Sequence, residues 1–264
     1  MVRGLLASVM VGVICAVMGT YVVLRGMAFL GDAMAHAILP GVAIAFLLHG
    51  NLLVGAVIAA VIVALSIGLF SKGGTVKEDT AIGILFAAAL SLGVALISSI
   101  QTYAVDLSHI LFGNVLGVSV TDLWLTAGLG LVVLASVALF YKQFMVISFD
   151  PILAATLRLP SGLLTNLLLI LMALTVSVAM QTVGVALMVA MLVTPAATAS
   201  LLTRRLWQGM LVSAAIGAVS AVTGLYLSYY LNIVSGSAIV LTATAIFLVV
   251  FIFHPRRGLI WKKR

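Results

Sequence analysis

The sequence predicts an all-α integral membrane protein, a single polytopic domain over residues 1–264 that crosses the bilayer with about nine helices, eight to ten at the limits. Composition is the first observation: 64% of the 264 residues are hydrophobic and only 7% are charged, against roughly 25% in soluble domains. A mean hydropathy of +1.37 is the second. A water-soluble globule of this size would expose most of its Leu, Val, Ile and Ala, so lipid must solvate much of the surface.

The third observation is the length of the apolar stretches, which can each cross about 30 Å of hydrocarbon. They lack the alternation typical of barrel strands, and backbone polar groups cannot remain unpaired in lipid, so each is predicted to be a helix. The first has no small-residue cleavage site before Arg25 and is interpreted as a retained span. Because the chain enters it within a few residues of Met1, we expect the natural protein to begin slightly upstream. The nine stretches are 4–24, 27–48, 52–70, 81–100, 123–141, 163–180, 183–202, 206–231 and 238–253.

Residues 107–118, between the fourth and fifth stretches, are apolar but too few to cross the bilayer. They predict a short re-entrant or interfacial helix. His109 and the nearby Asp106 are candidates for an outer gate. The alternative is that His109 is simply solvated at the membrane interface.

Basic residues predict the orientation, because Lys and Arg favour cytoplasmic loops. With nine spans and a cytoplasmic carboxyl terminus, every one of the 13 Lys and Arg residues except Arg3 lies inside. Despite the net charge of +7, these residues are dispersed singly or in pairs between apolar runs, which argues against a nucleic-acid-binding face. We therefore expect membrane lipid, and no nucleic acid, among the partners.

The longest cytoplasmic connection, residues 142–162, is predicted to hold a short amphipathic helix over 152–159. Asp150 suits the N-cap, Pro151 suits the first helical turn, and Pro160 stops the helix. A helix that lies across the cytoplasmic face could be the contact through which a partner protein moves the spans. The alternative is an interfacial helix that only packs on lipid headgroups.

Asp32 and His36 in the second stretch are the candidate metal ligands. Four residues apart on a helix, they share one face and can reach one ion. Carboxylate oxygen and imidazole nitrogen suit Mn²⁺, Fe²⁺ or Zn²⁺, and an ionisable pair inside an apolar helix indicates function. The alternative is that the side chains hydrogen-bond each other or a neighbouring helix. The break expected at Pro40 and Gly41 frees backbone carbonyls and favours the ion site.

A stripe of small residues lies beside that face and predicts the close approach of another helix. One chain offers only two ligands. If two chains met at this helix in a symmetric dimer, they would supply two carboxylates and two imidazoles, a complete site at the centre of a channel. The stripe consists of Ala33, Ala37, Gly41 and Ala45.

Several motifs are absent from the sequence. There is no phosphate-binding P-loop, so the chain is not expected to hydrolyse nucleotide, and the HExxH and GxSxG motifs of proteases and lipases are missing. Cys15 is the only cysteine, which excludes an intrachain disulfide and a thiolate metal cluster. Energy for transport must therefore come from an ion gradient or from a partner.

Five motifs in order resemble the bacterial ABC permeases that import manganese, zinc and iron. The resemblance covers essentially the whole chain and implies a transmembrane permease domain, a homodimer, and a pair of separate cytoplasmic ATP-binding subunits. It also implies an extracytoplasmic metal-binding protein outside the bacterial cytoplasmic membrane. ATP is then bound by the partner, and this chain is no enzyme and holds no permanent cofactor. The motifs are Leu24-Arg25 with AFLGDAMAHAILPG (28–41), EDTAIG (78–83), HILFGNVLG (109–117), Phe149-Asp150-Pro151, and VGVALMVAMLVTPAAT (183–198).

By position, Asp32 and His36 match the family's intramembrane metal ligands. The segment from Phe149 to Leu159 matches the coupling helix that enters the ATPase cleft. The resemblance therefore implies a coupling role for Phe149, Asp150, Pro151, Ala155 and Leu159.

The transported metal is predicted to be manganese, with zinc or iron as the alternative. Zinc members often read DTLAHASLLG around the ligand pair, whereas Ala33 and Leu39-Pro40 resemble the manganese branch. Glu78 and Asp79 also match a family motif, for which the residues themselves indicate only capping of the following helix.

Functions of other classes would place different demands on these residues. A gradient-driven secondary carrier or channel would use Asp32 as a proton or ion relay. A membrane-embedded metalloenzyme would need a nucleophile or general base, and none shares the face of the ligand pair. A siderophore or vitamin importer would need a large polar-lined cavity in place of a compact ligand pair.

Overall fold

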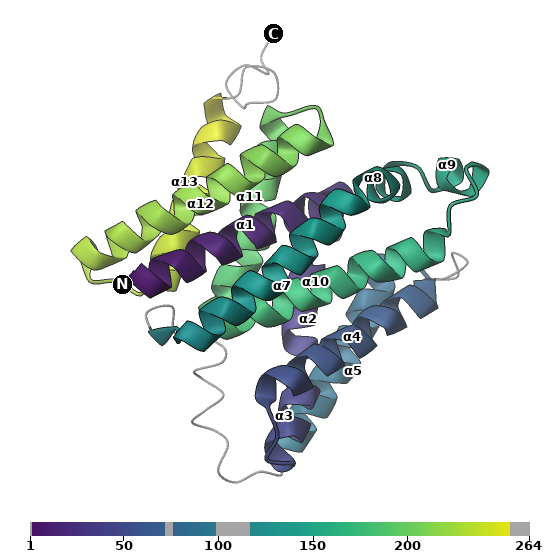
Figure 1. Cartoon of the computed structure of the whole chain (residues 1–264), viewed down its shortest axis with the longest axis horizontal. Coiled ribbons are helices and arrows are strands. Elements are labelled where there is room, and N and C mark those ends of the chain that lie inside the picture. The colour runs from purple at the N-terminus through teal and green to yellow at the C-terminus, as the bar shows by residue number, and fades with distance from the viewer. Residues whose placement is uncertain (1, 72–75, 99–116, 254–264) are drawn as a thin grey trace.

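The structure is a computed structural model that describes residues 2–71, 76–98 and 117–253. Within these residues it consists of helices and contains no strand (Figure 1). The predicted all-α membrane architecture is confirmed. The helices are α1 (Val2–Leu24), α2 (Leu30–Ala37), α3 (Leu39–Leu47), α4 (Leu52–Ser71), α5 (Glu78–Ser98), α7 (Val120–Leu139), α8 (Tyr141–Phe149), α9 (Pro151–Thr156), α10 (Ser161–Val183), α11 (Val185–Leu202), α12 (Leu206–Leu231) and α13 (Ser235–Phe253).

Nine helical segments of the described chain are long and apolar enough to cross a membrane, as the sequence predicted. α2 and α3 together form one of them, Leu30–Leu47. α10 and α11 are joined by a single residue, Gly184, at φ +82°, a conformation that suits glycine. The two spans therefore meet at Gly184, and α10 runs past residue 180, where its end was predicted.

The predicted re-entrant helix over 107–118 lies outside the described residues except for Gly117 and Val118, and the outer-gate candidates Asp106 and His109 lie outside them as well. The next span starts earlier than predicted.

A capping box sets that start. The Ser119 hydroxyl accepts a hydrogen bond from Asp122 N, and the Asp122 carboxylate accepts one from Ser119 N, both at 3.1 Å. This exchange satisfies backbone donors that a helix start leaves free. α7 therefore begins at Val120 and not at residue 123.

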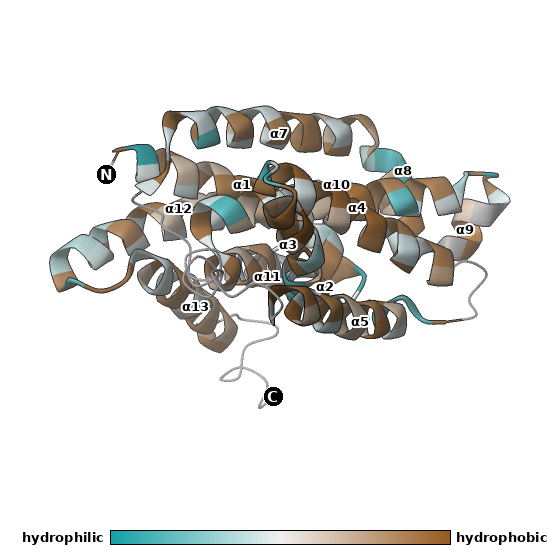
Figure 2. Cartoon of the chain, turned by 90° about the horizontal axis from the view of Figure 1, so that it is seen from below, coloured by the Kyte–Doolittle hydropathy of each residue, from teal (hydrophilic) through white to brown (hydrophobic). Residues whose placement is uncertain are grey.

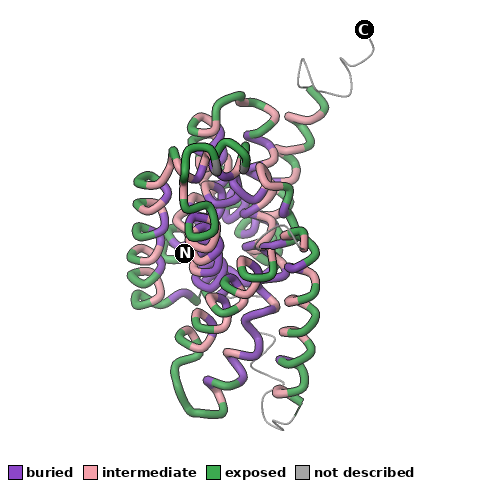
Figure 3. Tube along the Cα trace, turned by 90° about the vertical axis from the view of Figure 1, so that its right-hand side faces the viewer, coloured by how far each residue is buried: buried purple, intermediate pink, exposed green. Residues whose placement is uncertain are grey.

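The core of the bundle is formed by α1, the α2–α3 span and α10, which are the most buried spans. In Figure 3 the buried parts of the trace gather inside and the exposed parts outside. α4, α5, α7 and α13 lie at the periphery, and Figure 2 shows hydrophobic residues along much of α5 and α7. Their exposed side chains include large apolar ones such as Leu131 and Leu241. Lipid is the solvent that such a surface suits.

α1 packs closely against α12 because glycines stand at the crossing. A Cβ built at Gly12 would lie 3.1 Å from the Gly217 carbonyl oxygen. Nearby, the Ser213 hydroxyl donates a buried hydrogen bond to the Ala16 carbonyl, 2.9 Å away. Close backbone contact and interhelical hydrogen bonds thus hold α12 to the core, where lipid supplies little hydrophobic driving force between helices.

The small-residue stripe of the second span packs inside the chain. Gly41 and Ala45 face α4: a Cβ at Gly55 would lie 2.6 Å from the Ala45 Cβ, and a Cβ at Gly41 would overlap the Gly55 carbonyl oxygen. The close approach that the stripe predicted is therefore made between α3 and α4 of one chain. The neighbouring face, with the candidate ligands, is left for other contacts.

Replacing Gly41 by alanine is expected to destabilise the bundle by about 1–3 kcal/mol, because the added methyl group overlaps the Gly55 carbonyl oxygen. Thermal unfolding of the purified protein in detergent measures this as a lower Tm. Gly128→Ala is the matched control, since a Cβ at Gly128 meets nothing within 4 Å. Equal Tm values for the two variants would contradict the close α3–α4 contact.

Candidate metal site and coupling segment

The candidate ligands Asp32 and His36 lie on one face of α2, as their spacing predicted. His36 Nε2 is 3.6 Å from Asp32 Oδ1, which is longer than a hydrogen bond. The His36 side chain is 27% exposed and the Asp32 side chain 39%, whereas the other six residues of α2 are buried. The pair is therefore the uncovered part of α2, and lone pairs on both side chains remain for a further partner.

Aromatic rings border the pair on the side of α5. The Phe86 ring meets His36 edge to face, with centroids 5.9 Å apart, and meets Phe29 in the same way at 5.4 Å. Contacts of this geometry are favourable beyond their buried area. α5 therefore forms one wall of the candidate site and restricts the position of the imidazole.

One chain does not supply a complete metal site from its described residues. No group of three or more His, Cys, Asp or Glu side chains in that part could hold an ion. Transition metals in proteins take about four or more ligands. Asp32 and His36 can therefore complete a site only with ligands from beyond the described residues, such as water or a second copy of the chain.

The helix interruption falls at Ile38, two residues before Pro40, slightly earlier than predicted. Pro40 has no N–H to donate to the His36 carbonyl four residues earlier, so the helical ladder is interrupted one turn before the proline. Ile38 stays right-handed, at φ −74° and ψ −24°, and its carbonyl accepts hydrogen bonds from Gly41 N and Val42 N. The ligand pair thus sits on the last regular turns of α2, beside the break.

Residues 149–159, the predicted coupling segment, begin at the last residue of α8 and include α9 at one end of the bundle (Figure 1). Asp150 caps α9 as predicted, because its Oδ1 accepts hydrogen bonds from Ile152 N at 2.9 Å and Leu153 N at 3.0 Å. α8 follows α7 after a single-residue interruption at Phe140. The connection predicted over 142–162 is therefore helical for most of its length.

α9 is shorter than predicted and ends at Thr156, not at Leu159. Arg158 takes φ +52°, and Leu159 N donates to the Ala154 carbonyl at 3.1 Å. This is the hydrogen bond of a Schellman turn, which closes a helix by placing one residue in the left-handed region. The turn therefore ends α9 before Pro160 is reached.

The coupling segment presents large apolar side chains at the end of the bundle. Phe149 is 61% exposed and Ile152 is 80% exposed, whereas Leu159 packs partly buried against the core. The side chains of Pro151 and Ala155 lie outside the described part of the structure. Apolar groups gathered in this way suit contact with a protein partner or a membrane interface.

An ion pair between Arg25 and Glu78 was not predicted. Arg25 Nη1 lies 3.5 Å from Glu78 Oε2, and Arg25 Nη2 donates to Thr165 Oγ1 at 3.3 Å. Burial lowers the pKa of the Arg25 guanidinium from its ordinary value, and the Glu78 carboxylate opposes that shift; arginine nevertheless stays protonated. Arg25 and Glu78 each lie at the end of an apolar span and belong to two different family motifs. They are far apart in the sequence, so the sequence did not indicate that they pair.

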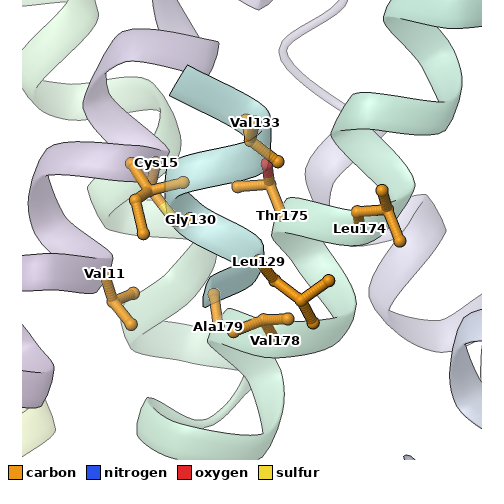
Figure 4. Close-up of a pocket in the computed structure, with 10 residues that line it drawn as sticks. Val11, Cys15, Leu129, Gly130, Val133, Leu174, Thr175, Val178 and Ala179 are labelled. Carbon is orange, nitrogen blue, oxygen red and sulfur yellow. The ribbon is translucent and has the colours of Figure 1, made fainter. Parts of the chain in front are cut away.

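Two cavities in the described part differ in what they can hold. An open cleft of about 1270 Å³ lies between α4, α8 and α10, with Arg25 and Ser148 among its lining residues. A cavity of about 10 Å³ lies among α1, α7 and α10, and apart from Thr175 its lining is apolar (Figure 4). It can hold one water molecule at most. Neither cavity is lined by Asp32 or His36.

Known proteins resemble this chain over nearly all of its length. A model of the ABC 3 transport family matches residues 1–254. The manganese transport system membrane protein MntC of Halalkalibacterium halodurans is 48% identical over 258 residues, covering 98% of this chain and 88% of that protein. The manganese import system permease protein ScaB of Streptococcus gordonii is 42% identical over 261 residues, covering 99% and 94%.

A solved structure shares the same fold. A chain of PsaBC from Streptococcus pneumoniae, in complex with Fab, has a TM-score of 0.84 and 40% sequence identity to this chain. The match covers 97% of this chain and 92% of that one. Taken with the family model, these similarities show that the chain belongs to the ABC 3 transport family.

Proposed function

We propose that the chain is the membrane-spanning permease subunit of an ATP-binding-cassette importer for a divalent transition metal, with manganese as its substrate. The observation that carries the proposal is the Asp32–His36 pair, two metal-ligand side chains left partly exposed on an otherwise buried helix. The two relatives named for manganese, at 48% and 42% identity, support the choice of metal. Zinc or iron is the alternative substrate, because the same ligand types suit all three.

A homodimer completes the site in this proposal. Two copies of α2, facing each other across a two-fold axis, supply two carboxylates and two imidazoles. The partial exposure of Asp32 supports this arrangement, because a carboxylate left facing hydrocarbon is costly. The exposed ring of Phe29 on the same side would then be covered by the partner subunit as well.

The protein works in the bacterial cytoplasmic membrane, with the coupling segment on the cytoplasmic side. An extracytoplasmic metal-binding protein releases the cation into an outward-facing vestibule, where the carboxylates attract it and the imidazoles replace part of its water shell. A pair of ATP-binding subunits contacts residues 149–159 and moves them when ATP binds and is hydrolysed. The spans then rock, and the cavity around the ion opens to the other side.

Neutralising the ligand pair should abolish transport of the substrate metal. Asp32→Asn and His36→Gln are each expected to reduce manganese uptake by roughly 10–100-fold, because each replaces a carboxylate or imidazole ligand with a weaker neutral amide. Radiolabelled manganese, zinc and iron uptake is compared in cells that also carry the ATP-binding subunit and the binding protein. His49→Asn, at an exposed loop position with φ +51°, is the matched control. Normal uptake by an Asp32→Asn, His36→Gln double variant present in the membrane contradicts the site.

An exposed apolar residue of α9 should bind the ATP-binding subunit. Ile152→Ser is expected to weaken co-purification of that subunit by about 10-fold, the effect of losing one well-packed apolar contact. Val234→Ser is the control, because Val234 is 70% exposed and lies between α12 and α13, at the opposite end of the spans. Equal recovery of the ATP-binding subunit with both variants would show that α9 does not form the contact.

A secondary carrier is the rival function, and the energy source separates the two. With an ATP-binding subunit whose P-loop lysine is replaced, manganese uptake is expected to fall to background, since this chain has no P-loop of its own. Uptake that persists with the inactive subunit and stops when the proton gradient is collapsed would replace the importer with a gradient-driven carrier.

A further inference from the structure

We propose that Arg25 is a positioning residue for transport, through which movement of α10 reaches α2, the helix that carries Asp32 and His36. The inference rests on the proposed function. It gives a role to Arg25 and Glu78, two residues of the family motifs that do not belong to the proposed metal site. Three observations carry it: the rigid turn that bears Arg25, its contacts with two other helices, and the cleft beside it.

The turn between α1 and α2 holds Arg25 firmly. Arg25 N donates to the Tyr21 carbonyl at 3.0 Å, and Met27 N donates to the Val22 carbonyl at 3.0 Å. Gly26 takes φ +70°, which completes a Schellman turn at the end of α1. α2 starts at Leu30, so a force on the Arg25 side chain acts through a short, hydrogen-bonded connection on the helix with the metal ligands.

The side chain of Arg25 joins this turn to α5 and α10. It is 8% exposed. Among the described residues its polar partners are Glu78, the first residue of α5, and Thr165, one turn into α10. A buried guanidinium that loses its carboxylate partner is strongly unfavourable, so Glu78 holds α5 to the turn. Further along α5, Phe86 contacts the His36 ring. The same pair therefore fixes the wall of the site relative to the ligands.

α10 brings the coupling segment within reach of Arg25. It begins at Ser161, two residues after the coupling segment ends at Leu159, and Thr165 accepts a hydrogen bond from Arg25. A shift of residues 149–159 therefore reaches the α1–α2 turn through one turn of helix and one hydrogen bond.

The cleft supplies the room for such a shift. Its volume is about 1270 Å³, and Arg25, Glu78, Ser148 and Thr165 all line it. The Ser148 hydroxyl is buried without a hydrogen-bond partner among the described residues, and Arg25 Nη1 makes its 3.5 Å ion pair with Glu78 but no hydrogen bond there. A buried polar atom without a hydrogen bond is costly. Narrowing of the cleft would bring the α1–α2 turn and the end of α8 together. The cluster thus has open space beside it and buried polar groups that would gain hydrogen bonds in a second arrangement.

The decisive variant is Thr165→Val, which keeps the side-chain shape and the Arg25–Glu78 pair but removes the acceptor on α10. We expect the ratio of manganese transported to ATP hydrolysed to fall by about 5-fold or more, while KM for manganese changes by less than about 2-fold, because the ligands are intact. Glu78→Gln should also lower this ratio, because it removes the carboxylate partner of Arg25. Thr223→Val, on an exposed face of α12, and Asp79→Asn, exposed beside Glu78, are the matched controls, expected to behave as the parent protein.

The readout is made on the assembled transporter in liposomes, with the amount of each variant in the membrane measured first. If Glu78→Gln fails to accumulate, Thr165→Val decides alone. An unchanged ratio for Thr165→Val overturns the positioning role, as does a rise in KM with the ratio intact. Asp32→Asn, run in parallel, separates the two proposals: if it transports normally the metal site is wrong, whereas if it is inactive and Thr165→Val is normal, only the role of Arg25 is wrong.

Discussion

The absence of water from the hydrocarbon region determines which groups of this chain can be left uncovered. Backbone amides must pair within their own helices, and apolar side chains can face outward, as they do on α4, α5, α7 and α13. Hydrophobic burial then contributes little to helix association, so the helices meet at small residues such as Gly12 with Gly217 and Gly41 with Gly55. A polar or charged side chain within these spans is costly to expose to hydrocarbon, so such side chains indicate function.

Two polar clusters meet this constraint in different ways. Arg25 is buried, with Glu78 and Thr165 as partners from two other helices. Asp32 and His36 are partly exposed, and their 3.6 Å separation leaves both free to bind another partner. The described residues supply both partners of Arg25, but they supply too few ligands around Asp32 and His36 for a complete metal site. That contrast is why the first is proposed as a structural link and the second as a site for the transported ion.

Local sequence patterns predicted much of this molecule. The lengths of the apolar runs gave the nine spans found in the described residues, and the four-residue spacing placed Asp32 and His36 on one face of α2. Asp150 was identified as the cap of α9 and is one. Each of these depends on residues within a few turns of each other, where helix geometry alone relates sequence to space. The outer-gate candidates Asp106 and His109 lie outside the described residues and stay a prediction.

The sequence by itself determined that the chain is a bundle of helices in lipid, with Asp32 and His36 on one face of the second span as the candidate ligand pair, because composition, run length and helical period are local properties. Only the tertiary structure decided that Gly41 and Ala45 of the small-residue stripe pack on α4, that α9 closes at Thr156, and that Arg25 pairs with Glu78. These outcomes depend on which helices lie side by side. Packing among apolar spans of similar composition is set by the fit of their surfaces, and no spacing along the chain records that fit.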